Sequence, residues 1–365
     1  METIALDFTS SLYLDFRHGS RSLGPWSQLT TGRPAALAEP AGSERVADRL
    51  AKLQGCQQAT LAQSTLHLFW DLFGLLAAER IVIFLDAGSY PIARWGIERA
   101  AGRGVPVHRF PHKDAAALGR LLRQKAGGRW PVVVADGICT VCGCSAPIAD
   151  YLEVVRRAGG WLVLDDTQAL GILGAAPGPA APYGQGGGGS LRYQDISGPD
   201  VVVISSLAKG FGAPVAALSA SSELLRQFRA RSETRVHCSP PSAADIRAAE
   251  HALSLNEDDG DARRSQLAAR VHQFRRGLAA IGLEAEGGLF PVQTLIPIPD
   301  LEAKQLYERL LKHGVRTILR RSHHDSEPRL SFIITARHSP GVIERVVDVL
   351  EQVVTITPQL EVESG

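Results

Sequence analysis

The chain has 365 residues, of which 45% are hydrophobic and 21% charged, and its formal net charge is +1. These values are ordinary for a globular protein and give no sign of a nucleic-acid partner. The length suits one large and one small domain. No run reaches the roughly 18 apolar residues of a membrane span, and the N-terminus lacks the pattern of a signal peptide. We therefore expect a cytoplasmic protein with no membrane partner.

Three regions are predicted along the chain. Residues 1–45 are irregular, with three prolines and several glycines, and are expected to pack across both domains. Residues 46–240 are predicted to form the large domain and residues 241–365 the small one.

Within the large domain, short apolar runs alternate with helical patterns. The predicted strands are Ile81–Asp86, Val107–Phe110, Pro131–Asp136, Trp161–Asp165 and Val201–Ser206. The predicted crossover helices are Leu66–Glu79, Tyr90–Gly102, Ala115–Ala126 and Ile148–Ala158. Continuously apolar strands indicate burial on both faces of a mostly parallel sheet, which is an α/β fold. Ligands of such sheets bind at the carboxyl ends of the strands, so the residues after each strand are the candidates for chemistry.

Three cysteines follow the third of these strands, in the pattern Cys139-x-x-Cys142-x-Cys144. The spacing is similar to the start of a metal or iron–sulfur site, which normally needs four ligands. No second pair of ligands lies close behind it, so we favour three free thiols in a tight loop. His323-His324-Asp325, further along, is likewise interpreted as a solvated loop, with a metal site as the alternative.

The fourth strand ends in a carboxylate pair, Asp165-Asp166. Such a pair could ligate magnesium. It could also place one carboxylate against the pyridine nitrogen of pyridoxal phosphate (PLP), whose protonated ring is an electron sink. Asp165 is the better placed of the two, and Asp166 is expected to point elsewhere, into a structural ion pair.

Ala175–Asp200 contains Gly186–Gly189 and three prolines in its first half. This composition predicts a flexible surface insertion, either a mobile cover for the active site or a plain loop.

The fifth strand is followed by Ser206-Leu-Ala-Lys209-Gly-Phe-Gly212. A lysine at the end of a buried strand must be paired, neutralised or used covalently, unless it extends to the surface from its glycine-rich turn. Partial burial would make its amine a nucleophile near neutral pH. Together with Asp165, this lysine favours PLP over magnesium.

After Ser242 the pattern changes to helices mixed with short strands, which predicts a smaller α+β domain. The predicted helices are Ala243–Leu253, Asp261–Ile281, Leu301–His313 and Pro340–Val353, and the predicted strands are Val292–Ile296, Val315–Leu319 and Arg329–Thr335.

These motifs carry a family resemblance. The runs Asp136–Pro147, Asp165–Gly171 and Ser206–Gly212 together resemble the α-oxoamine synthases, a family of the fold-type-I aminotransferase superfamily that includes 8-amino-7-oxononanoate synthase and glycine C-acetyltransferase. Asp7–Leu14 and Pro328–Ser331 are similar to further segments of that family, so the resemblance covers nearly the whole chain. It implies a PLP-dependent transferase with a large domain and a smaller C-terminal one.

By this resemblance Lys209 matches the Schiff-base lysine and Asp165 the partner of the pyridine nitrogen. Ser206 matches a phosphate-binding threonine, and Thr140 matches a serine that bonds the phenolic oxygen of the cofactor. Arg329 matches the arginine that grips the amino-acid carboxylate, a bidentate geometry that lysine does not reproduce.

The turn Ser64-Thr65-Leu66 matches the one whose helix N-terminus cradles the phosphate. Tyr90 stands where the family has a histidine stacked on the ring, and an aromatic residue keeps that stacking. Gln168 replaces a histidine three residues after the aspartate, and glutamine cannot transfer a proton. His237 and Ser239 lie where the family's partner subunit reaches the phosphate, which implies a homodimer.

The family's glycine-rich Gly-Ser-Gly-Gly-Ser run has no counterpart near residues 30–43. The leading interpretation is condensation of an amino acid with an acyl-CoA or acyl-carrier thioester. The alternatives are a transaminase on the same scaffold and a non-catalytic protein of the PLP fold. The sequence does not identify the amino acid or the acyl group.

Overall fold

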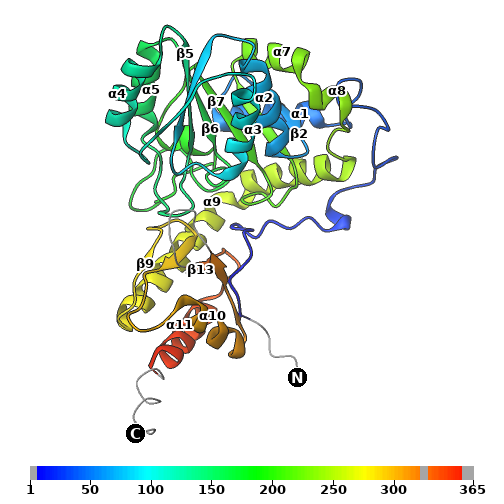
Figure 1. Ribbon diagram of the computed structural model, residues 1–365. Helices are drawn as coiled ribbons and strands as arrows, with labels where there is room; N and C mark the ends of the chain where they lie inside the picture. The colour runs from blue at the N-terminus through cyan, green and yellow to red at the C-terminus, as the bar shows by residue number, and fades with distance from the viewer. Residues whose placement is uncertain (1–5, 321–327, 356–365) are drawn as a thin grey trace. The chain divides into compact units, whose positions relative to one another are not determined.

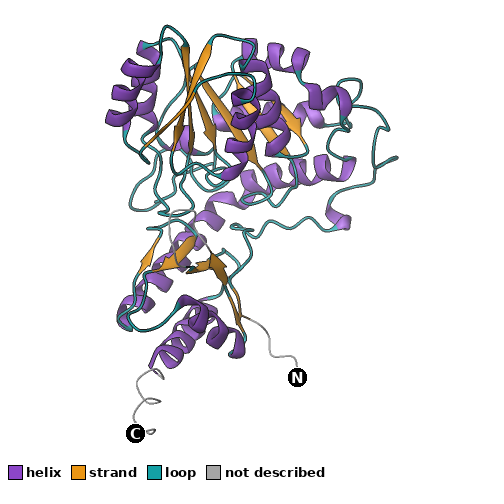
Figure 2. Cartoon of the chain, in the orientation of Figure 1, coloured by secondary structure: helices purple, strands orange, loops and turns teal. Residues whose placement is uncertain are grey.

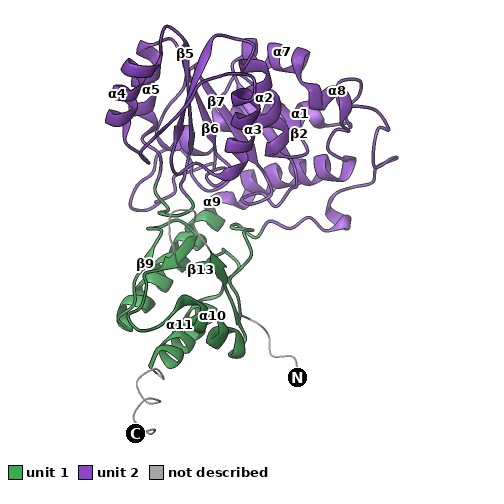
Figure 3. Cartoon of the chain, in the orientation of Figure 1, with its two compact units in different colours: residues 1–15, 140–144, 262–365 green, residues 16–139, 145–261 purple. Residues whose placement is uncertain are grey.

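The computed structural model describes residues 6–320 and 328–355, so His323-His324-Asp325 lies outside the described residues. Two compact units make up the chain (Figure 3). The large unit comprises residues 16–139 and 145–261, and the small unit residues 1–15, 140–144 and 262–365. One continuous helix, α9 (Ala243–Ala280), has residues in both units. The division between the units falls within this helix, after residue 261. Among the described residues, no helix has the length and apolar character needed to cross a membrane.

A seven-stranded sheet forms the centre of the large unit (Figure 1), in the order β2-β8-β7-β6-β5-β3-β4. Its strands are β2 (Gln58–Ala62), β3 (Ile81–Asp86), β4 (Val107–Phe110), β5 (Trp130–Asp136), β6 (Trp161–Asp165), β7 (Val201–Ser206) and β8 (Ala216–Ala220). Only β8 runs against its neighbours. The predicted mostly parallel α/β sheet is confirmed.

Helices cover both faces of this sheet (Figure 2). They include α1 (Ser43–Gln54), α2 (Thr65–Leu76), α3 (Pro91–Ala101), α4 (Ala115–Lys125), α5 (Ile148–Arg157) and α7 (Ser222–Arg231), with short helices at Ser20–Ser22 (η1), Ser190–Tyr193 (α6) and Glu233–His237 (α8). The four predicted crossover helices correspond to α2, α3, α4 and α5.

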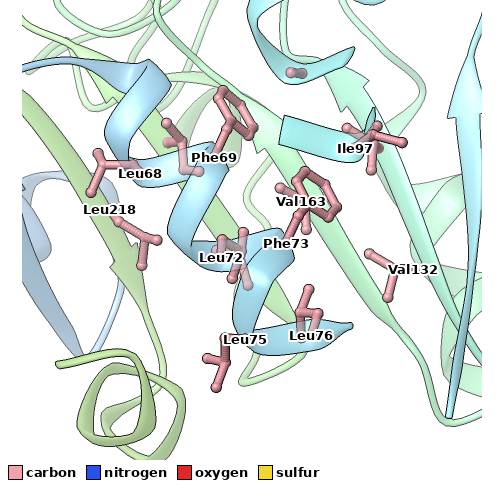
Figure 4. Packing of buried hydrophobic residues seen from close by; sticks show 14 of the residues in the cluster. Leu68, Phe69, Leu72, Phe73, Leu75, Leu76, Ile97, Val132, Val163 and Leu218 are labelled. Carbon is pink, nitrogen blue, oxygen red and sulfur yellow. The ribbon is translucent and has the colours of Figure 1, made fainter. Parts of the chain in front are cut away.

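Alternate residues of the strands supply two separate cores. In β3, Ile81 and Ile83 belong to the cluster beneath α2 and α3, whereas Val82 and Phe84 belong to the cluster beneath α4 and α5. Figure 4 shows Phe69, Leu72 and Phe73 of α2 against the strand residues. Apolar side chains on both faces explain why these strands read as continuous apolar runs.

The segment Ala175–Asp200 was predicted to be a flexible surface insertion, and this prediction was wrong for its centre. Gly187, Gly188 and Gly189 are buried. The carbonyl of Gly187 accepts from the N–H of Gly171, and the N–H of Gly189 donates to the carbonyl of Leu173. The glycines allow close backbone packing here, which composition alone does not distinguish from a flexible linker.

We expect Gly188→Ala to destabilise the protein by about 1–3 kcal/mol, because a Cβ there would lie 2.3 Å from the carbonyl oxygen of Leu53. Gly178→Ala is the matched control in the same segment, since a Cβ at Gly178 meets nothing within 4 Å. Urea unfolding of both variants measures the difference. Equal stability of the two would contradict the packing described above.

The small unit is an α+β arrangement, as predicted. Its four-stranded antiparallel sheet has the order β12-β13-β10-β9, from Ile318–Arg320, Arg329–Ile333, Val292–Leu295 and Ala285–Glu286. Helices α10 (Ala303–Lys312) and α11 (Pro340–Thr355) and the C-terminal part of α9 complete it. The predicted strand Val315–Leu319 is two strands, since β11 (Val315–Arg316) pairs in parallel with β1 (Leu6–Asp7).

Candidate active site

Buried carboxylates end three neighbouring strands of the large sheet. Asp86 ends β3, Asp136 ends β5 and Asp165 ends β6, and Asp136 and Asp165 are register partners. All three side chains are buried. Because parallel strands carry their carboxyl ends at one edge, these groups meet at the edge where such sheets bind ligands.

Of the two paired carboxyl groups, Asp165 has more contacts that stabilise its charged form. Burial raises the pKa of Asp165, but hydrogen bonds from Thr167 and the charge of Lys209 oppose that rise. Burial and the charge of Asp165 raise the pKa of Asp136 well above its ordinary value, although the N–H of Tyr90 donates to it at 3.1 Å. Of the two groups, Asp165 is therefore the one whose surroundings favour the charged form.

Asp166 points away from this pair. Its Oδ2 accepts from the N–H of Ser190 at 2.9 Å, and its oxygens lie where side chains on Gly137 or Gly189 would be. Burial raises the pKa of Asp166 to about 6. The two consecutive carboxylates diverge as expected, but Asp166 holds a backbone amide and not the ion pair that we predicted.

Lys209 lies in a tight turn after β7. Burial lowers the pKa of its amine, and the charge of Asp165 opposes that shift. The turn is positioned by Gly210, where a Cβ would lie 2.4 Å from the carbonyl oxygen of Leu170. Gly171, with φ +88°, completes this close approach. A partly desolvated amine beside a carboxylate is suited to nucleophilic attack on a carbonyl group.

Thr167 connects the aspartate and lysine segments, and sequence reasoning did not single it out. Its N–H donates to Asp165 Oδ1 at 3.1 Å, and its hydroxyl accepts from the N–H of Ser206 at 3.1 Å. The Ser206 hydroxyl in turn accepts from the N–H of Ala208. Gln168 follows in the same turn and is half-buried.

Helix α2 begins with an N-cap at Ser64, whose hydroxyl accepts from the N–H of His67. Thr65 and Leu66 form its first turn, whose N–H groups have no partner within the helix and suit an anion. Tyr90 is the N-cap of α3, and its residue surface is 48% exposed. An exposed ring is available for stacking.

Two predicted site residues, Thr140 and Arg329, belong to the small unit. The carbonyl of Thr140 accepts from Arg320 at 2.9 Å. Arg329 forms an ion pair with Glu286 at 2.8 Å and donates to the carbonyl of Leu295. Both Arg329 and Glu286 line a cavity of about 730 Å³ within that unit.

A histidine pair supports the lysine segment from the N-terminal side. His18 Nε2 donates to the carbonyl of Phe211 at 2.7 Å, and His18 Nδ1 lies 2.9 Å from His251 Nδ1. Since Nε2 carries the proton donated to Phe211, the neutral ring accepts at Nδ1 a hydrogen bond from Nδ1–H of His251. Burial lowers the pKa of His18.

We expect this pair to make stability fall in mild acid. Below pH about 6.5 an unfolded histidine binds a proton that the folded His18 resists, so stability is full above this pH and is lost as the pH falls through the lowered pKa. The loss of Tm between pH 7 and 5 should be smaller in His18→Gln, which keeps a donor but does not titrate. The exposed His272→Gln is the control, and identical slopes in all three proteins would contradict the assignment.

Comparison with known proteins identifies the family of this chain. The family model for aminotransferase class I and II matches residues 39–350. The chain belongs to the aminotransferase class I and II family. It is therefore a PLP-dependent transferase, as predicted.

Solved structures with the same fold include α-oxoamine synthases. A serine palmitoyltransferase from S. paucimobilis, in complex with PLP and myriocin, is 16% identical with a TM-score of 0.84, over 96% of this chain and 88% of that chain. The serine palmitoyltransferase of Sphingomonas wittichii is 17% identical with a TM-score of 0.83 over the same shares. The 8-amino-7-oxononanoate synthase of Francisella tularensis is 17% identical with a TM-score of 0.74, over 96% and 98%. The predicted resemblance and fold are confirmed.

The residues present fit PLP. The cofactor has an aldehyde, a ring nitrogen that binds a proton and a phosphate. The large unit offers a lysine amine with a lowered pKa, a buried carboxyl group near that amine and a 12-residue helix with its N-terminus capped by Ser64. These three groups match the three features of the cofactor in chemical type.

Proposed function

We propose that the protein condenses an amino acid with an acyl thioester. The observation that carries this proposal is the fold shared with two kinds of α-oxoamine synthase over 96% of the chain, with Lys209 and Asp165 after neighbouring strands of that fold. Serine palmitoyltransferase and 8-amino-7-oxononanoate synthase condense an amino acid with an acyl thioester, and this chemistry is the model for the present chain.

Each chain residue has a defined task in this proposal. Lys209 holds the cofactor through its Nζ and later moves the proton of the substrate α-carbon. Asp165 keeps the ring nitrogen protonated, and PLP when bound supplies the electron sink. Thr167 holds Asp165 in place through its N–H.

The remaining contacts hold the cofactor's periphery. Ser64, Thr65 and Leu66 at the start of α2 bind the phosphate together with Ser206. Tyr90 stacks on the ring and Thr140 bonds its phenolic oxygen. Gln168 contributes hydrogen bonds alone, so proton transfer rests on Lys209.

Arg329 is proposed to bind the substrate carboxylate, which must compete with Glu286 for the guanidinium. We expect Arg329→Lys to raise the KM for the amino acid about 10- to 100-fold, the value of a charge-assisted hydrogen bond pair. Glu286→Gln should lower that KM, because it removes the competing carboxylate. Glu302→Gln, in the same cavity, is the control. A KM unchanged by both Arg329→Lys and Glu286→Gln would remove Arg329 from the substrate site.

Transamination is the second candidate, because Gln168 cannot transfer the proton that the family's histidine could. The two are separated by supplying a panel of amino acids to the holoenzyme, with and without acetyl-CoA, octanoyl-CoA and palmitoyl-CoA. Condensation releases CoA only when both substrates are present, whereas transamination releases a keto acid without any thioester. Release of neither would support the non-catalytic interpretation.

We also propose that the protein is a homodimer. Val236 is 51% exposed, and His237 and Ser239 beside it are exposed on the same short segment. These are the residues that would reach the partner's phosphate site. Sedimentation at micromolar concentration measures the state, and a cofactor-bound monomer would contradict it. The cytoplasmic location stays a prediction.

A further inference from the structure

A second group of reactive residues lies at the same edge of the large sheet. Asp86 ends β3, His112 lies two residues after β4, and Cys139 lies three residues after β5. These are three adjacent strands in the order β5-β3-β4. The proposed cofactor contacts do not use any of the three.

His112 is held by Asp86 with a defined orientation. His112 Nδ1 lies 2.7 Å from Asp86 Oδ1, and Asp86 is 2% exposed. The same carboxylate accepts from the N–H groups of Gly88 and Lys113 and from the hydroxyl of Tyr151 at 2.8 Å. A carboxylate with this many donors stays charged, and burial of Asp86 is outweighed so that its pKa is lowered.

The ring also lies directly against the main chain. A Cβ at Gly88 would lie 2.4 Å from His112 Nδ1. Because Gly88 has no side chain, it leaves room for the imidazole of His112 beside Asp86. Gly88→Ala would displace the ring without touching the thiol or the carboxylate.

Cys139 completes the group. Its side chain hydrogen-bonds His112, and the residue is 4% exposed. A ring nitrogen of His112 and the sulfurs of Cys139 and Cys142 all lie within 4.8 Å of one another. Since Nδ1 is taken by Asp86, Nε2 is the nitrogen left for the sulfur. The order of groups is thiol, imidazole and carboxylate, which is how a cysteine nucleophile is activated.

The protonation state favours a thiolate. The hydrogen bond to Asp86, followed by that to Cys139, raises the pKa of His112 to about 10. The ring is therefore an imidazolium at neutral pH, and a cation beside a cysteine favours its thiolate form. Burial and the charge of Asp165 raise the pKa of the nearby Asp136 well above its ordinary value, which lessens its repulsion of a thiolate at Cys139. Cys56 is the contrast within the chain, since burial raises the pKa of its thiol to about 12.

We propose that Cys139 is an acyl acceptor that takes the acyl group from the thioester substrate before condensation. This inference rests on the proposed function, which brings an acyl thioester to this edge of the sheet. Asp136, three residues before Cys139, is the register partner of Asp165, so the acceptor follows the strand next to the cofactor carboxylate.

The step balances as a thioester exchange. The Cys139 thiolate attacks the carbonyl carbon, a new carbon–sulfur bond forms, and the bond to the carrier sulfur breaks. The carrier leaves as a thiolate and takes the proton of the His112 imidazolium, which becomes a neutral imidazole. Acylation removes the thiolate that helped to hold this proton, so its release becomes easier at the moment it is needed.

The test uses the holoenzyme with acetyl-CoA, octanoyl-CoA or palmitoyl-CoA and no amino acid. We expect one equivalent of CoA to be released in a burst, and the acyl mass to be found on the peptide that contains Cys139. Cys139→Ala should abolish the burst, and His112→Gln and Gly88→Ala should slow it at least about tenfold. Cys56→Ser and Cys238→Ser are the matched controls and should retain it. An adduct on another cysteine would overturn the proposal.

Adding the amino acid separates this inference from the proposed function. If Cys139→Ala forms the condensation product at the wild-type rate, the function stands and the acyl acceptor is wrong. If Cys139 is acylated but no amino acid yields product, the acceptor stands and the condensation fails. If the wild type gives neither adduct nor product with any of the thioesters, both fail.

Iodoacetamide gives a readout that needs no substrate. At pH 6 Cys139 should be alkylated at least tenfold faster in the wild type than in His112→Gln, because only the wild type keeps the imidazolium. Equal rates, or stoichiometric zinc that shields the thiol, would overturn the proposal.

Discussion

Lys209→Ala should abolish covalent attachment of PLP and lower turnover by on the order of 10²–10⁴-fold. The wild type should show a visible absorption band that borohydride removes, with the pyridoxyl group recovered on Lys209. The reason is the position of the amine, whose pKa is lowered by burial next to the carboxyl group of Asp165.

Lys125→Ala, on the exposed surface of α4, is the control and should leave both properties unchanged. The assignment would be wrong if Lys209→Ala still yielded a borohydride-stable pyridoxyl adduct on a single lysine. PLP bound without a covalent link, through the phosphate and ring contacts alone, is the result we expect from this variant.

Asp165→Asn should leave PLP bound but lower turnover by about 10²–10³-fold, the cost of removing one preorganised electrostatic partner of the reacting group. Asparagine keeps the shape and the hydrogen bond from Thr167, yet it cannot hold the proton on the ring nitrogen. Asp166→Asn should change turnover by less than about threefold, since this side chain bonds Ser190 on the other side of the strand.

For stability the order of the two variants should be reversed, with the larger effect in Asp166→Asn. Asp166→Asn should lower the free energy of unfolding by about 1–3 kcal/mol, because asparagine keeps the size of the side chain but loses the charge of the oxygen that accepts from the N–H of Ser190. Exchange of the substrate α-proton, followed by NMR, measures the catalytic effect directly. Rapid exchange in Asp165→Asn together with none in Asp166→Asn would reverse the two roles.

The central sheet could be predicted because its strands are apolar on both faces. Ile81–Asp86 and Trp161–Asp165 were placed correctly to the residue. Strands β2 and β8 were not predicted, since Gln58–Ala62 and Ala216–Ala220 are rich in alanine and carry weak β-propensity. Their position comes from antiparallel pairing with each other and with β7, which is a tertiary effect.

The candidate site was predictable where a residue ends a buried strand, as Asp165 does. Thr167 and the Asp136–Asp165 pair were not, because their roles depend on the register between strands and on the path of a turn. The group of Asp86, His112 and Cys139 is assembled at the ends of three strands that are separated in sequence, and the cysteine pattern after the third predicted strand marks only Cys139. Gly186–Gly189 was misinterpreted because glycine serves both flexible linkers and close backbone contact.

The contact of Gly171 with Gly210 makes the spacing of the cofactor groups a property of the main chain. A Cβ on Gly171 would lie 3.0 Å from Cα of Gly210, so the turn after Asp165 and the turn that holds Lys209 touch without any intervening side chain. Repacking of side chains elsewhere in the large unit cannot tune that separation. Redesign of the reaction therefore has to work on the substrate-facing residues, and the main-chain spacing of these two turns can be treated as a constant of the scaffold.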